Sequence, residues 1–129
     1  MASDRIAVMV ALKAHTAKVV AALATNCVAE LTERTPLDTG WARANWIPSL
    51  GAPVVTVSGD PKRVSDTEKQ AGLAAMLAYK LEDGSAFVSN PVPYIRFLDG
   101  GSSSQAPAGF VRAAIARAII DTGSGRLVA

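Results

Sequence analysis

The chain has 129 residues, a formal net charge of +2 and a single cysteine. This length supports one domain, which we place at residues 1–121, followed by a flexible tail over residues 122–129. Charged residues make up 19% of the chain without a run of one sign, a pattern that argues against a dedicated nucleic-acid binder. One cysteine excludes an internal disulfide. The N-terminus lacks the basic start and long apolar run of a secretory signal, and because no stretch has about 18 uninterrupted apolar residues, the sequence predicts no membrane-spanning helix.

Residues 4–34 predict one long helix that Ser3 or Asp4 can cap and that Pro36 ends. Its predicted buried stripe follows the spacing of three and four residues that one helix face requires. The stripe comprises Met9, Leu12, Thr16, Val19, Val20, Leu23, Cys27 and Leu31. The one histidine, His15, has no acidic partner at helical spacing, so we interpret it as a partly exposed helix residue rather than a metal ligand.

Residues 35–40 predict a turn, in which Asp38 bonds nearby amides and Gly40 supplies a positive φ. Residues 41–47 alternate in polarity and predict a strand with Ala42, Ala44 and Trp46 on one face. A turn at residues 48–53 leads to a second predicted strand, the β-branched run 54–57. Residues 58–64 predict a polar loop.

Ser65 and Glu68 have the spacing of a capping box, which predicts that a helix begins there. Its predicted apolar face consists of Leu73, Met76, Leu77 and Leu81, and Gly72 is expected to weaken the helix modestly. Residues 86–88 predict a third strand.

Residues 88–115 are rich in proline, glycine and aromatic side chains. Residues 90–93 must be extended, because each residue before a proline is pushed out of helical geometry. Residues 94–99 predict a short helical turn that ends at Gly100 and Gly101, and residues 102–105 an exposed loop. A last helix is predicted from Pro107, with Arg112 and Arg117 flanking a buried stripe of Phe110, Val111, Ala114, Ile115, Ala118 and Ile119.

These elements predict an α+β fold. The N-terminal and C-terminal helices pack on an antiparallel sheet of three or four strands, and the middle helix lies between the second and third strands.

Asp38-Thr39-Gly40 also has the form of an aspartic-protease signature, which would need a second carboxylate from a dimer partner. The proline-ended helix before it and the bulky Trp41 after it favour a turn instead. The chain has no phosphate-binding loop, dinucleotide fingerprint, zinc-ligand spacing or nucleophile elbow. The sequence therefore predicts a protein that is not an enzyme and holds no cofactor.

Two segments, about a third of the chain, resemble the tail-completion (head–tail joining, neck) proteins of long-tailed bacteriophages. Residues 35–46, T-P-L-D-T-G-W-A-R-A-N-W, are similar to the family's T-P-x-D-T-G-x-x-R-x-x-W segment. The second segment, residues 88–115, follows in the same order as in the family, and the similarity within it lies in residues 90–94, N-P-V-P-Y, and residues 105–112, Q-A-P-A-G-F-V-R. The residues singled out as candidate interface or structural positions are Asp38, Gly40, Arg43, Trp46, Asn90, Pro93, Tyr94, Gln105, Pro107, Phe110 and Arg112.

The resemblance implies a ring around the DNA channel, with six copies to match the symmetry of tail tubes. Such a ring would contact a head-connector or head-completion protein on one side and a tail terminator or tail-tube protein on the other. DNA would pass through without sequence recognition, and the protein would be made in the host cytoplasm and reside in the virion neck. The alternative is a tail terminator, which caps the tube and fixes its length.

Two interpretations of the motif residues stay open. We expect interface residues at 90–94 and 102–110, but the same prolines, glycines and aromatics can serve only to fix a difficult chain path. Arg43 can contact a neighbouring subunit or pair with a carboxylate of its own chain, and the fork of its guanidinium favours the second.

Overall fold

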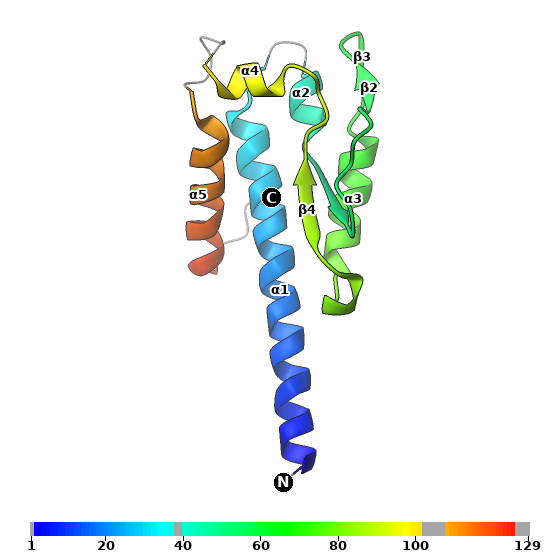
Figure 1. Cartoon of the computed structure of the whole chain (residues 1–129), viewed down its shortest axis with the longest axis vertical. Helices are drawn as coiled ribbons and strands as arrows, with labels where there is room; N and C mark the ends of the chain where they lie inside the picture. The colour runs from blue at the N-terminus through cyan, green and yellow to red at the C-terminus, as the bar shows by residue number, and fades with distance from the viewer. Residues whose placement is uncertain (1, 38–39, 102–107, 126–129) are drawn as a thin grey trace.

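The structure is a computed structural model that describes residues 2–37, 40–101 and 108–125. It confirms the α+β class. The long helix α1 runs through the middle of the molecule, with α5 on one side and the β1–β4 pair, covered by α3, on the other (Figure 1). In chain order the elements are α1 (Ala2–Arg34), α2 (Trp41–Ala44), β1 (Ile47–Leu50), β2 (Gly59–Asp60), β3 (Arg63–Val64), α3 (Thr67–Leu77), the 3-10 helix η1 (Leu81–Asp83), β4 (Ala86–Ser89), α4 (Ile95–Asp99) and α5 (Phe110–Gly123).

The long N-terminal helix is confirmed, but its predicted buried stripe is wrong over the first half. Residues 2–16, the exposed half of α1, extend beyond every other element (Figure 1) and are solvent-exposed throughout. Residues 17–34, the packed half, lie against α5, β4 and α3 and bury Ala24, Val28 and Leu31. Met9, Leu12 and Thr16 are thus on the surface because no described element reaches them, and Val19 of the predicted stripe is exposed as well.

Within the described residues, α1 is also the helix long and apolar enough to cross a membrane by length and composition. An 18-residue window has a mean hydropathy of 1.7, and 6% of that window is buried. The absence of a spanning helix therefore stays a prediction.

The strand predicted at residues 41–47 is wrong. Gly40, with φ of +85°, starts the short helix α2, and the strand β1 begins only at Ile47. Ala42 and Ala44 are both buried, as an alternating strand would also require. Here the single helical turn before β1 buries both of these small side chains. Pro48, predicted in a turn, lies in β1, which pairs antiparallel with β4 in the register Ile47↔Ser89 to Leu50↔Ala86. A proline is tolerated there because β1 has a partner on one edge only.

The predicted strand at 54–57 is also wrong, and the predicted loop at 58–64 contains a hairpin instead. Val55 is 82% exposed, so the β-branched run has no sheet to join. Strands β2 and β3 pair with each other, and the Asp60 carboxylate accepts the amides of Lys62 and Arg63 at 2.8 Å each to form the turn. The described strands thus form two separate antiparallel pairs rather than one sheet of three or four strands.

Helix α3 is confirmed, but its predicted capping box and part of its predicted apolar face are wrong. Asp66 is its N-cap residue, and no side-chain cap hydrogen bond forms there. Met76 is fully buried, but Leu77 is 85% exposed and Leu81 belongs to η1. Gly72, expected only to weaken the helix, has a packing role, because a Cβ there would lie 2.1 Å from the Pro48 carbonyl oxygen. Glycine lets α3 approach β1 this closely.

The strand predicted at 86–88 is confirmed and reaches Ser89, and the short turn predicted at 94–99 is confirmed as α4. Helix α5 begins at Phe110, after Gly109 with φ of +80°, rather than at residue 107. It ends at Gly123, two residues beyond the domain boundary predicted at residue 121. Residues 126–129 of the predicted tail lie outside the described residues.

The buried face of α5 differs in part from the predicted stripe. Phe110, Ala114 and Ala118 are buried as predicted, whereas Ile115 and Ile119 are exposed. The small alanines let α5 lie close to α1, and the larger isoleucines point outward. The core cluster is formed by Leu31, Trp46, Phe110 and Ala114, with Cys27 packed against it as predicted.

Candidate functional site: the motif cluster at the end of the long helix

The two segments that carry the family resemblance meet at the C-terminal end of α1. The side-chain amide of Asn90 donates to the Ala42 carbonyl at 2.9 Å, and the rings of Trp41 and Tyr94 are 5.8 Å apart. Segments about 45 residues apart in sequence thus form one structural unit at one end of the molecule. We call it the motif cluster; it comprises Thr35, Gly40, Trp41, Arg43, Asn45, Trp46, Asn90, Tyr94 and Phe110.

Trp46 closes the end of α1. Its indole N–H donates to the Thr35 hydroxyl at 2.6 Å, and that hydroxyl donates to the Leu31 carbonyl at 2.6 Å. All three residues are buried. A buried indole usually finds such a partner, and here the bond ties the core to the last turn of the helix.

Arg43 also holds the end of α1, through a different partner from the one expected. Its Nε donates to the Thr35 carbonyl at 2.6 Å and a terminal nitrogen donates to the Glu33 carbonyl at 3.3 Å. The partners that the structure gives this guanidinium are carbonyl oxygens rather than a carboxylate. A cation at this point satisfies acceptors that every helix leaves open at its C-terminus and complements the helix dipole.

Lys69 of α3 reaches the same helix end. Its ammonium donates to the Thr32 hydroxyl at 2.8 Å and to the Arg43 carbonyl at 2.6 Å. Burial lowers the pKa of Lys69 to about 8; nearby Asp66 opposes this shift and Arg43 adds to it. The sequence analysis did not identify Lys69, because the helical spacing of apolar residues does not reveal that a lysine of the helix is buried.

Asn45, which was not predicted as a site residue, holds the following loop against α2 at Ser58. Its amide accepts the Ser58 N–H at 2.7 Å and donates to the Trp41 and Ser58 carbonyls at 2.9 and 3.1 Å. The Trp41 indole also donates to the Ser58 carbonyl, at 3.1 Å. A fully buried asparagine with this bonding is a structural residue.

The second segment contains both anchored and exposed residues. The Asn90 side chain accepts the Val92 amide at 3.1 Å and so makes the turn that buries Val92. Asp99 links α4 to α5: its carboxylate accepts the Val111 amide at 3.0 Å and its carbonyl accepts the Gly109 amide at 2.8 Å. Asp99 is a further residue that the sequence did not single out.

The predicted site residues therefore separate into groups. Gly40, Arg43, Trp46, Asn90 and Phe110 fix the chain path, and Tyr94 is half-buried beside Trp41. Pro93 and Arg112 are exposed. Asp38, Gln105 and Pro107 lie outside the described residues.

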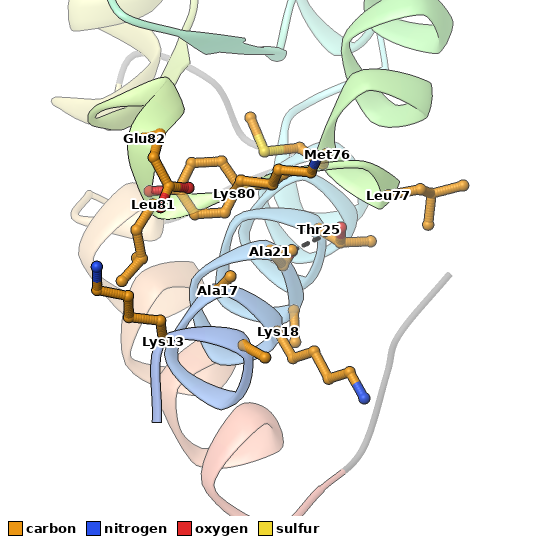
Figure 2. A pocket seen from close by; sticks show the side chains of 13 residues that line it. Lys13, Ala17, Lys18, Ala21, Thr25, Met76, Leu77, Lys80, Leu81 and Glu82 are labelled. Carbon is orange, nitrogen blue, oxygen red and sulfur yellow. Dashed lines mark hydrogen bonds between the residues drawn. The ribbon is translucent and has the colours of Figure 1, made fainter. Parts of the chain in front are cut away.

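A cleft of about 470 Å³ lies away from the motif cluster, where α1 leaves the body of the molecule. We call it the alanine cleft, because Ala14, Ala17, Ala21 and Ala22 of α1 form its floor. Figure 2 shows α1 along one wall and the end of α3 with η1 along the other. The remaining lining residues are Lys13, Lys18, Thr25, Met76, Leu77, Tyr79, Lys80, Leu81 and Glu82.

A buried polar contact between α1 and α5 was also missed. Asp121 is 1% exposed, and one of its carboxyl oxygens accepts from Arg117 Nε at 3.2 Å. The other oxygen has no hydrogen-bond partner among the described residues, and the neighbouring Glu30 carboxyl donates to it when protonated. Burial raises the pKa of Glu30; Arg34, at 3.0 Å, opposes the shift, whereas Asp121 and Glu33 add to it.

Among the described residues no group of three or more His, Cys, Asp and Glu side chains is placed to hold a metal ion. His15 is exposed on α1, and burial raises the pKa of the Cys27 thiol, which keeps it protonated.

Comparisons with protein-family models, curated proteins and solved structures gave no match to this chain.

Proposed function

We propose that this protein is a structural component of the head–tail junction of a long-tailed phage, assembled as a ring around the DNA channel. The two motif segments supply the proposal, as described from the sequence. The observation that most strongly supports the proposal is the hydrogen bond between Asn90 and Ala42, which joins the two motif segments. Residues that resemble one family in two distant segments act together in one structural unit, as expected of a shared fold rather than of chance similarity.

The geometry also refines which motif residues would contact partners. Residues that bond within the chain, such as Arg43 and Trp46, set the shape of the motif cluster. Pro93 and Arg112 are exposed, and Phe97 in the adjoining helix α4 is 70% exposed. Exposed aromatic side chains and arginines are the residue types enriched at interface centres. This surface is therefore where a head-connector or tail protein would bind.

A second surface suits contact between copies. The exposed half of α1 carries large apolar side chains that no described element of the chain covers. A ring in which each copy contacts two neighbours would bury such a surface.

The test is electron microscopy of lysates from a phage that lacks the gene, complemented with the wild-type gene as the control. Filled heads beside separate tails of normal length support the proposal. Tails of abnormal length would assign the tail-terminator role instead. Intact infectious particles would overturn both.

Complementation with variants then separates the two groups of motif residues. Phe97→Ala or Arg112→Glu is expected to give a folded protein that fails to join heads and tails. Trp46→Ala is expected to lower the amount of folded protein. Full complementation by the double variant of Phe97 and Arg112 would contradict the assignment of this surface.

A further inference from the structure

The alanine cleft is apolar inside and carries a positive charge at its edges. Its volume of about 470 Å³ lies within the range of small-molecule sites, roughly 300–1,000 Å³. The aliphatic and thioether side chains that line it are Ala14, Ala17, Ala21, Ala22, Met76, Leu77 and Leu81. The charged lining residues are Lys13, Lys18, Lys80 and Glu82, three positive and one negative, which gives the cleft a net charge of +2.

The helical geometry of α1 places lysines on both sides of the alanine floor. At about 100° per residue, Ala14, Ala17 and Ala21 lie within about 60° of one another, on one face of the helix. Lys13 and Lys18 each lie about 70° from the centre of that face, on opposite sides. Figure 2 shows these two lysines on either side of the floor and Lys80 on the opposite wall. A molecule that lies along the floor therefore has ammonium groups around it.

The hydroxyl groups of the cleft are already bonded within the chain. The Thr25 hydroxyl donates to the Ala21 carbonyl at 2.8 Å (Figure 2), and the Tyr79 hydroxyl donates to the Gly84 carbonyl at 2.6 Å. By contrast, none of the three ammonium groups forms a salt bridge within residues 2–37, 40–101 and 108–125. The polar groups left for a ligand are thus the charged groups at the edges.

This chemistry selects the class of ligand. An extended peptide or a sugar would bury amide or hydroxyl groups against the alanine floor without hydrogen-bond partners, which is unfavourable. An alkyl chain carries no such group and gains from the burial of its methylenes. An anionic head on that chain complements the net positive charge of the lining residues. A long-chain carboxylate combines both properties.

We propose that the alanine cleft binds a free long-chain carboxylate, with the alkyl chain along the alanine floor and the carboxylate held by the lysines at its edge. The floor follows α1 from Lys13 to Thr25, about 18 Å of helix, which is longer than an extended dodecanoate chain. The site is independent of the proposed function, because none of its lining residues belongs to the motif cluster.

The test is a titration of the whole chain with dodecanoate below the concentration at which it forms micelles, followed by calorimetry and amide NMR spectra. Binding is expected to saturate at one molecule per chain, with the largest shifts at residues 13–25 and 76–82. Decanoate, which is two methylenes shorter, is expected to bind roughly tenfold more weakly. Dodecyltrimethylammonium, with the same chain length and the opposite charge, is expected not to bind.

Two variants locate the site. Ala21→Phe fills the floor, and the double variant Lys18→Glu with Lys80→Glu reverses two of the charges. Each is expected to weaken dodecanoate binding by about tenfold or more, because one removes the alkyl contacts and the other the charge partners. The matched controls are Ala113→Phe and Lys62→Glu, at exposed positions outside the cleft, and both are expected to bind as the wild type does.

Circular dichroism checks that each variant is folded, and the double lysine variant, changed only at exposed positions, decides the test if Ala21→Phe does not fold. Three results would overturn the proposal: titration without saturation, equal binding of the cationic amphiphile, or unchanged affinity in the folded cleft variants. Binding to vesicles of anionic phospholipid without any shift from dodecanoate would also overturn it, because the surface would then contact a membrane rather than a free carboxylate.

Discussion

The two halves of α1 have similar composition and opposite surroundings. Both are rich in alanine and valine, yet residues 17–34 are packed on several sides and residues 2–16 extend into solvent. The packed half carries polar groups with defined partners: Asn26 donates to the Thr122 hydroxyl at 2.9 Å, and Glu30 faces Asp121. The apolar pattern is thus similar in both halves of α1. The buried polar pairs occur only in the half that packs against other elements of the same chain.

The largest expected effect comes from truncating one large side chain that packs on the packed half of α1 and one in its exposed half. Phe110→Ala removes a buried ring that packs on the packed half and is expected to cost about 3–5 kcal/mol of unfolding free energy. Ile6→Ala in the exposed half is expected to change it by less than about 0.5 kcal/mol at concentrations where the protein is monomeric. Urea unfolding measures both, and equal losses would contradict the division of the helix.

A second variant tests the close approach of α3 to β1. Gly72→Ala places a Cβ against the Pro48 carbonyl, which is backbone and cannot swing aside, so we expect a loss of about 1–3 kcal/mol. Gly123→Ala is the matched control, because a Cβ there meets nothing within 4 Å. Thermal unfolding should show a lower Tm for the first variant only, and an unchanged Tm for Gly72→Ala would refute the packing role.

Trp46→Phe tests the bond that closes α1. The indole donor to Thr35 is lost while most of the ring volume stays, so the expected cost is about 1–3 kcal/mol. Faster amide exchange in the last turn of α1, with the exposed half unaffected, is the accompanying observation. No change in either quantity would mean that Trp46 acts by volume alone.

The smallest expected effect concerns pH. The raised pKa of Glu30 means that the folded state retains a proton that the unfolded state releases. Its stabilising contribution is fully present below the ordinary glutamate pKa and is lost as pH rises through the raised value. Glu30→Gln cannot titrate and retains a donor toward Asp121, so its unfolding free energy should depend less on pH in this range. A wild type and variant with parallel pH profiles would exclude the shared proton.

Local sequence signals predicted the elements that carry their own start and stop residues. Pro36 ends α1, and Gly100 follows α4, so both helices were found from the chain alone. The segment at 41–50 was not, because the alternation of Ala42, Ala44 and Trp46 with polar residues also fits a helical turn, and Asn45 bonds to the distant Ser58. The partners of Lys69 and Gly72 lie on other elements, so no local pattern reports them.

The buried face of α5 could not be predicted for a related reason. Hydrophobicity ranks isoleucine above alanine, which placed Ile115 and Ile119 inside. The fold instead packs the alanine side against α1, where small side chains allow close contact. The candidate site was predicted in part: the motif residues meet as one unit, but their partners are carbonyls and ring edges that only the fold supplies.

The most direct test of the account is hydrogen exchange of α1 measured at low and high protein concentration. We predict that amides of residues 2–16 become protected as concentration rises, whereas amides of residues 24–34 are protected equally at both. In Val10→Asp, which places a charge on this exposed apolar surface, residues 2–16 should remain unprotected at high concentration. Protection of residues 2–16 that does not depend on concentration, or that persists in Val10→Asp, would contradict the claim that a second copy covers this helix.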